Sequence, residues 1–167
     1  MKRITISIFL VICLLSSFGL SIVAGAAEEN TWVECSTLME VSKDTQYFED
    51  GSYLVTTIKA SPSSRANVYT RNGMKEVILY NSSDEVQWNY YLIGTFTVEA
   101  GVSAVCTNST YSYTIVNDKW SLTSHNNYYS GNIAYGEATF KKKVLLITTN
   151  THDIEIYVAC DANGVIS

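Results

Sequence analysis

Residues 86–98, Val-Gln-Trp-Asn-Tyr-Tyr-Leu-Ile-Gly-Thr-Phe-Thr-Val, decide the fold of this chain. Every second position from Val86 to Val98 is apolar or glycine, and most positions between them are polar. A period of two is typical of a β-strand with one buried face. Gly94 interrupts the apolar face and indicates a bulge or a close backbone approach, because glycine has no side chain to pack.

Shorter segments of the same kind lie on both sides of this strand. Asn72-Gly73 separates two of them and predicts a tight hairpin turn, because this pair tolerates positive φ values. No segment has a convincing amphipathic helical period, so we expect an all-β chain folded as an antiparallel β-sandwich or barrel. The predicted strands cover residues 53–59, 66–71, 75–80, 86–98, 102–106, 111–116, 119–124, 133–140, 144–149 and 154–160.

Length and composition support one domain of this class. The chain has 167 residues, of which 47% are hydrophobic and 16% are charged, with a single proline. That composition is neither disordered nor coiled-coil, and the length allows one core. Residues 51–167 are therefore expected to form a single β-sandwich domain.

The first 26 residues have the features of a secretory signal peptide. Met1-Lys2-Arg3 is basic, residues 4–23 are uncharged and apolar, and Ala24-Gly25-Ala26 is a small-residue cleavage site. The alternative is an uncleaved membrane anchor. We expect a secreted or cell-surface protein without stable membrane insertion after cleavage. Loss of Lys2 and Arg3 makes the formal net charge of −5 more negative, which disfavours a nucleic acid partner.

Residues 27–50 are expected to form an acidic leading arm. From Glu28 to Asp50 the sequence has no sustained period of two or 3.6, and it contains seven of the sixteen acidic residues. A short strand at 31–35 is the one regular element predicted in this arm.

The cysteines suggest one disulfide. Cys13 would leave with the signal peptide, so Cys35, Cys106 and Cys160 remain, which allows three alternative single bridges. Cys106 and Cys160 each end an alternating apolar set, and this pattern favours a Cys106–Cys160 bridge in an oxidising compartment. Cys35 would then be a free thiol, so the protein would be a monomer or a Cys35-linked dimer.

The sequence contains no motif that supports catalysis. His125 lies in a polar segment that predicts a turn, and neighbours such as His152 and Asp153 point to opposite faces of a strand. There is no Gly-x-Ser-x-Gly motif, metal-ligand spacing or cofactor signature. Glu137 is the acid that we would name for a hydrolase.

Two features are candidates for binding. Five tyrosines could form an aromatic surface, although tyrosines in strands often bury their rings in the core. Val144-Leu145-Leu146 follows Lys141-Lys142-Lys143. If these six residues lie at an exposed tip, they form an interaction hairpin. If the strand continues through Val144-Leu145-Leu146, this segment is part of the core, and we favour this second alternative. The tyrosines of the candidate surface are Tyr91, Tyr111, Tyr113, Tyr128 and Tyr129.

Two resemblances add to this interpretation. The spacing of Cys106, Trp120 and Cys160 resembles that of immunoglobulin domains, but Val158 stands where those domains have a tyrosine. We take from it the general sandwich architecture only.

A closer resemblance covers residues 69–167 and rests on an ordered set of motifs. These motifs are Trp88-x-Tyr90-x-Leu92-x-Gly94-x-Phe96, Ser103-Ala104-x-Cys106-Thr107, Trp120-Ser121-Leu122, Ser130-Gly131-Asn132, Ala138-Thr139 and Cys160-x-Ala162-Asn163-Gly164. Together they resemble a family of small exported proteins that is common in Gram-positive gut bacteria and has no assigned function. The resemblance implies an exported bacterial β domain with a Cys106–Cys160 bridge, and it transfers no catalytic residue.

We therefore expect a non-enzymatic binding module whose partner is an extracellular glycan, wall polymer or protein. One alternative is an extracellular hydrolase of polysaccharide or peptide. The other is a structural protein that self-associates through Cys35.

Overall fold

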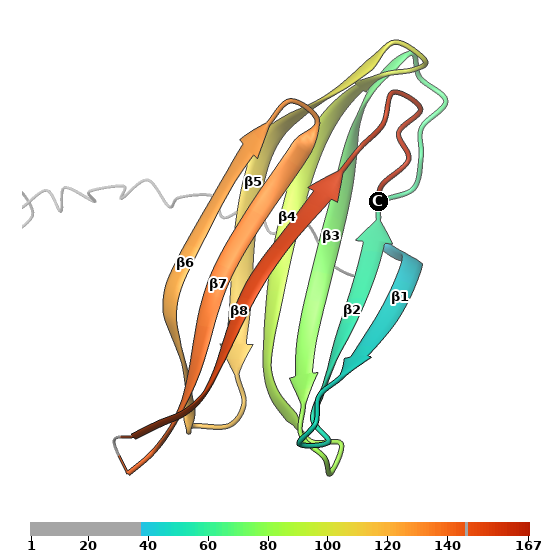
Figure 1. The fold of residues 1–167 in the computed structure, drawn as a ribbon. Helices are drawn as coiled ribbons and strands as arrows, with labels where there is room; N and C mark the ends of the chain where they lie inside the picture. Colours follow the sequence, from blue (N-terminus) through green and yellow to red (C-terminus); the bar gives the residue numbers. More distant parts are fainter. Residues whose placement is uncertain (1–37, 146) are drawn as a thin grey trace, which may run out of the picture. The chain divides into compact units, whose positions relative to one another are not determined.

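The computed structural model describes residues 38–145 and 147–167, which form eight strands (Figure 1). None of these residues belongs to a helix that could cross a membrane. The strands are β1 (Met39–Tyr47), β2 (Tyr53–Ala60), β3 (Val68–Tyr80), β4 (Val86–Glu99), β5 (Ser103–Ile115), β6 (Trp120–Ser130), β7 (Ile133–Val144) and β8 (Ile147–Ala159).

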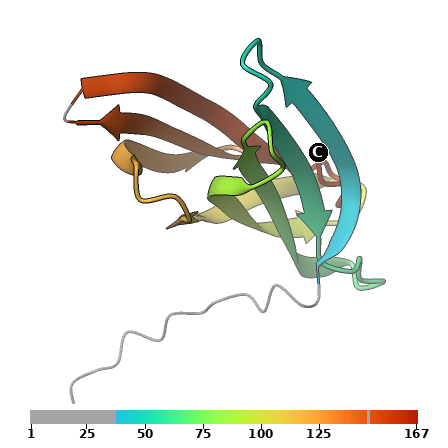
Figure 2. The ribbon, with the colours of Figure 1, turned by 90° about the horizontal axis from the view of Figure 1, so that it is seen from below.

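The strands form two antiparallel sheets, which confirms the predicted all-β sandwich. One sheet has the order β1-β2-β3-β4-β5 and the other β6-β7-β8, and the view from below in Figure 2 shows the two layers. Within each sheet every neighbour is also the next strand in sequence. This meander differs from the Greek-key order of immunoglobulin domains.

Strand β4 forms the centre of the core, as its alternation predicted. Trp88, Tyr90, Leu92, Phe96 and Val98 are all fully buried. They pack with buried residues of β7 and β8, which are Ala134, Ala138, Phe140, Ile154 and Val158.

Gly94 marks the close approach that the sequence predicted. A Cβ built there would lie 2.7 Å from the Phe96 ring and 3.1 Å from Ala134 Cβ of the facing sheet. The β4–β5 register also shifts between Thr95 and Phe96, immediately after this glycine. The glycine therefore allows the two sheets to approach at this level.

The hairpin predicted at Asn72-Gly73 is wrong, because β3 continues through both residues. Gly73 pairs with Ala60 on one side and with Gly94 on the other. A Cβ built on Gly73 would lie 2.7 Å from Val158 Cγ1 and 2.8 Å from Ile166 Cγ2. Close packing between layers, and not a turn, requires glycine at this position.

Three strand boundaries also differ from the predictions. The segments 102–106 and 111–116 are one strand, β5, because polar Ser109 pairs with Gly94 in the ladder and does not begin a turn. Strand β6 continues to Ser130, beyond the predicted end at residue 124. The segment 144–149 is not a strand of its own, because the β7–β8 turn lies within it, between Val144 and Ile147.

Strand β1 lies within the stretch that the sequence assigns to the leading arm. It pairs with β2 and forms an edge of the larger sheet. All nine of its residues are exposed, so its sequence has no buried face and no alternation of apolar residues. The short strand predicted at 31–35 lies outside the described residues, as does Cys35.

The predicted Cys106–Cys160 bridge is not formed in the structure. Both residues are buried and carry free thiols. Each thiol donates to a nearby backbone oxygen, from Cys106 Sγ to Asn108 O at 3.3 Å and from Cys160 Sγ to Asp161 O at 3.6 Å. Burial raises the pKa of Cys106, and it raises that of Cys160 to about 11, so both thiols stay protonated at neutral pH.

Candidate functional site

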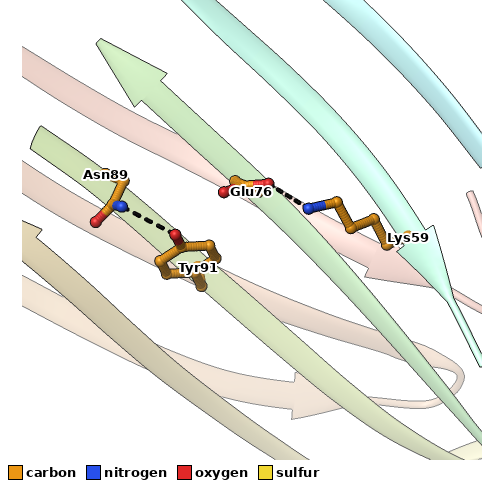
Figure 3. Close-up of polar contacts among 4 residues, drawn as sticks. All are labelled: Lys59, Glu76, Asn89 and Tyr91. Carbon is orange, nitrogen blue, oxygen red and sulfur yellow. Dashed lines mark hydrogen bonds and ion pairs between the residues drawn. The ribbon is translucent and has the colours of Figure 1, made fainter. Parts of the chain in front are cut away.

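The five tyrosines of the predicted aromatic surface do not lie together. Tyr91 is on the outer face of the larger sheet, where Asn89 Nδ2 donates to its hydroxyl at 2.9 Å (Figure 3). Lys59 and Glu76 form an ion pair on the same sheet, with Nζ and Oε2 2.7 Å apart. Tyr111 and Tyr113 lie on β5, while Tyr128 and Tyr129 lie on β6.

The two histidines lie in strands and not in exposed loops. His125 is on β6, and its Nε2 lies 2.8 Å from the hydroxyl of Tyr111 on β5. This contact links the neighbouring edges of the two sheets. His152 is on β8 among aromatic rings, with its ring centroid 4.9 Å from that of Phe48. Neither arrangement places a nucleophile beside a base that a third group orients.

A different set of tyrosines forms a row across the smaller sheet. Tyr128 pairs with Tyr135, and Tyr135 pairs with Tyr157, so the three side chains occupy the same level of β6, β7 and β8. The rings of Tyr128 and Tyr135 are stacked, with centroids 4.9 Å apart. The outer two members are 45% and 51% exposed. We call Tyr128, Tyr135 and Tyr157 the tyrosine row.

Two glutamates occupy the next level of the same face. Glu137 pairs with Glu155, and each is two residues from a member of the tyrosine row, so their side chains point the same way. Both are exposed. Like charges directly opposite each other are unfavourable in a sheet, and the pair therefore favours a partner that donates hydrogen bonds. Among the described residues no acidic, histidine or cysteine cluster is arranged to hold a metal ion.

The basic hairpin ends in an exposed apolar tip. Leu145 is 91% exposed, and Val144 and Ile147 are also exposed. The core interpretation of this segment is therefore wrong for Val144 and Leu145, because the chain turns there and leaves the core. Leu146 lies outside the described residues. The preceding Lys141, Lys142 and Lys143 are on β7.

A groove of about 430 Å³ lies on the side of the fold where β1 and β8 are the sheet edges. Lys75 lies in it, with Nζ 4.8 Å from the centroid of the Tyr157 ring. Burial lowers the pKa of Lys75. Lys43, Asp44, Asp153 and Glu155 also line the groove, so residues of both charges surround it.

Sequence reasoning named Tyr128 and Glu137 separately, and the structure brings them to the same face. It missed the third strand of this face, because the pairing of Tyr135 with Tyr157 depends on the register of β7 and β8. No family model, curated protein or solved structure matches this chain. The geometry of the described residues is therefore the basis for assigning a function.

Proposed function

We propose that this chain is an exported, non-enzymatic β-sandwich that binds a glycan on the outer face of β6, β7 and β8. The observation that carries the proposal is the tyrosine row beside Glu137 and Glu155. The basic, apolar and small-residue pattern of residues 1–26 supports export.

The chemistry of this face fits a polyhydroxylated polymer. Tyrosine combines an apolar ring, which packs against C–H groups, with a hydroxyl that forms hydrogen bonds. The two carboxylates accept hydrogen bonds from sugar hydroxyls. Three adjacent strands carry the row, so it extends for roughly 10 Å, twice the spacing between strands. An extended chain could therefore contact all three rings.

The Glu137–Glu155 pair also suggests a hydrolase, because glycosidases use two carboxylates. A glycosidase keeps its general acid protonated by placing it in a buried environment, and it holds its substrate in a cleft. Both glutamates are exposed on an open face. This favours binding without cleavage.

The test is a sedimentation assay of the mature protein with insoluble peptidoglycan, chitin and cellulose. We expect at least one polymer to retain the protein. The double substitution Tyr128→Ala and Tyr157→Ala should weaken that binding about tenfold or more, because each aromatic contact contributes on the order of 1 kcal/mol. Tyr47→Ala is the matched control, since Tyr47 is exposed on the other sheet.

Two results would contradict the proposal. One is the absence of binding to all three polymers and to soluble oligosaccharides derived from them. The other is full binding by the double variant. Release of reducing sugar by the wild type, with loss of release in Glu137→Gln, would instead establish the hydrolase.

A further inference from the structure

The groove of about 430 Å³ beside β8 lies where the two sheets differ in width. The larger sheet has five strands and the smaller has three, and β8 packs over β3 and β4. The smaller sheet ends at β8, so within the described ranges no strand lies over the inner faces of β1 and β2. The groove is therefore the place that a fourth strand of the smaller sheet would occupy.

The inner surface of this groove is largely apolar. Leu54 and Ile58 on β2 are half-buried and pack against the core, and Val77 on β3 is buried. Ile154 and Ile156 line the groove from β8. A strand added at this place would remove more of these side chains from water, which is favourable.

The C-terminal residues already pair with one end of the β8 edge. Ala159 N donates to Ser167 O and Ser167 N donates to Ala159 O, both at 3.0 Å, and Cys160 forms a bridge with Ile166. Ile166 is 2% exposed and packs over Gly73 of β3. The edge of β8 therefore accepts an antiparallel partner whose inward side chain is apolar and buried.

Main-chain groups of β8 point from this edge toward the groove. The N–H and C=O groups of successive residues in a strand point to alternate edges. Those of Ala159 point away from β7, and the β7–β8 register is regular here, so those of Asp153, Glu155 and Tyr157 do the same. Asp153 and Glu155 accordingly line the groove. In the part of the chain that the structure describes, no strand pairs with these three residues on that edge.

The β8 edge also lacks the features that prevent edge strands from pairing. Natural proteins commonly protect an edge with a lysine, a proline or a bulge. Strand β8 contains no lysine or proline, and its register with β7 is regular over residues 151–159. Strand β1, the other edge beside the groove, contains Lys43 and a register shift between Glu40 and Ser42. We therefore expect an added strand to pair with β8 and not with β1.

Lys75 favours an acidic side chain in the occupant of the groove. It is on the same face of β3 as Gly73 and Val77, and it lines the groove. Its Nζ lies 4.8 Å from the centroid of the Tyr157 ring and forms no ion pair with any described residue. Burial lowers the pKa of Lys75, because a desolvated ammonium group is costly. A carboxylate beside Nζ would offset that cost.

The acidic residues that line the groove do not supply this carboxylate. Asp153 accepts a hydrogen bond from Thr139 Oγ1 of β7 at 2.8 Å, on the outer face of the smaller sheet. Glu155 is beside the tyrosine row on that same outer face. Asp44 is on β1, two strands away from Lys75 on β3. The charge of Lys75 therefore remains available for a partner.

We propose that the groove binds an extended peptide segment of another protein, which pairs antiparallel with β8 and places an acidic side chain beside Lys75 and apolar side chains against Leu54 and Ile58. In strand addition, main-chain hydrogen bonds provide affinity and alternate side chains provide specificity. Residues 42–46 of β1 border the groove over about 14 Å, the length of about five extended residues. The proposed glycan site is on the outer face of the sheet, so each proposal can fail without the other.

The experiment measures the binding of short, fluorescein-labelled synthetic peptides to the mature chain by fluorescence anisotropy. Each peptide has valine at alternate positions and threonine between them, and a single glutamate replaces each valine in turn. We expect at least one of these peptides to bind. The same peptide with lysine in place of glutamate should bind about tenfold more weakly, because it cannot pair with Lys75.

Two pairs of variants locate the binding. Asp153→Pro removes an N–H from the free edge and should weaken binding about fivefold. Asp153→Ala is its matched control, because it also loses the bond to Thr139 but keeps the N–H, and it should bind like the wild type. Lys75→Met should abolish the preference for glutamate over lysine, whereas Lys75→Arg should retain it. Circular dichroism checks each fold, and the Lys75 pair keeps the test valid if Asp153→Pro does not fold.

Amide hydrogen exchange followed by NMR identifies the edge that is used. The N–H groups of Asp153, Glu155 and Tyr157 should exchange more slowly when the peptide is bound. Those of Ile154 and Ile156 point toward β7, so their exchange should change little. A contact made only by side chains would not produce this alternation.

Four results would overturn the inference. The first is that none of the peptides binds, and the second is that the Asp153→Pro and Lys75→Met variants bind them like the wild type. The third is slower exchange on β1 and not on β8. The fourth is slow exchange of the same three β8 amides in the protein alone that is lost on dilution, which would assign the groove to a second copy of this chain.

Discussion

The two ends of the sandwich are closed in different ways. At the cysteine end, formed by Gly73, Cys106, the β6–β7 turn, Cys160 and the C-terminal residues, main-chain hydrogen bonds link segments of the two sheets. Cys106 N donates to Gly131 O at 2.8 Å, and Gly101 N donates to Ala162 O at 2.8 Å. At the aromatic end, formed by Phe48, Trp88, Trp120, Phe140 and His152, large rings fill the space.

The difference lies in what fills the space between the two sheets. At the cysteine end main chain and small side chains approach closely, and a single added carbon at Gly73 would meet Val158. At the aromatic end large rigid rings pack against one another and leave a cavity of about 130 Å³. The two ends should therefore respond differently to removal and to addition of side-chain volume.

Removal of one ring should have the largest effect on stability. Phe140 is fully buried and stacks on Trp88. Phe140→Ala should reduce the free energy of unfolding by about 3–5 kcal/mol, since it removes a buried ring and leaves a void. Urea unfolding followed by circular dichroism measures the change. Phe140→Leu is the conservative control and should cost about 1.5 kcal/mol or less. A loss below about 1 kcal/mol for the alanine variant would mean that the rings do not support this end.

Filling the close approach at the cysteine end should have the next largest effect. Gly73→Val places side-chain atoms where Val158 and Ile166 already lie, so the free energy of unfolding should fall by about 1–3 kcal/mol. Gly101→Ala is the control for backbone conformation. Its added Cβ meets nothing within 4 Å, and its φ of +75° alone should cost about 1 kcal/mol. If both variants lose the same amount, close packing does not determine the stability of the cysteine end.

A substitution in the β7–β8 turn, at the same end as Trp120, should change the free energy of unfolding less, and it should increase it. Leu145 has a φ of +50°, a conformation that is unfavourable for a leucine, and its side chain is exposed. Leu145→Gly should raise the free energy of unfolding by about 0.5 kcal/mol, because relief of the backbone strain exceeds the added entropy of the unfolded chain. Thermal unfolding compares the two proteins. A loss of stability would show that this leucine makes stabilising contacts.

The smallest effect is a dependence on pH at the aromatic end. Burial lowers the pKa of His152 below its usual 6.5, while Asp50 and Asp153 oppose the shift. The unfolded chain therefore binds this proton more tightly than the folded protein. The stability that His152 contributes should be complete above pH 6.5 and decrease as the pH falls below that value.

The measurement is the urea midpoint at pH 7.5 and at pH 5.5. The midpoint of the wild type should be lower at pH 5.5, and His152→Phe should reduce the difference. His125 remains in both proteins and serves as the internal control. An equal difference in both proteins would assign the pH dependence to other groups.

The sequence predicted the parts of the fold in which one face of a strand is buried. Strand β4 was found because its alternation extends over thirteen residues, 86–98, with Gly94 as the one break in its apolar face. Strand β1 was not found, because an exposed edge strand has no apolar face. Asn72-Gly73 was misread because the same glycine serves a turn or a close approach, and only the position of Val158 distinguishes them.

The candidate sites were less predictable than the fold. The tyrosine row depends on the register of three strands, and a shift of one residue would turn Tyr157 to the other face. The cavity of about 130 Å³ at the aromatic end is lined by residues from distant segments, among them Asp50, Trp120 and His152. Neither residue spacing nor composition indicates that Trp120 would be buried without an acceptor.

The meander order of the strands also has a consequence for how the chain folds. Within each sheet every strand pairs only with its neighbours in sequence, so every step of sheet assembly closes a short loop. Short loops carry a small entropic cost, and proteins with mainly local contacts fold faster than Greek-key sandwiches of similar size. In the proposed export, which would begin at the N-terminus, the strands would become available in their pairing order, and each hairpin would form before the next strand arrives.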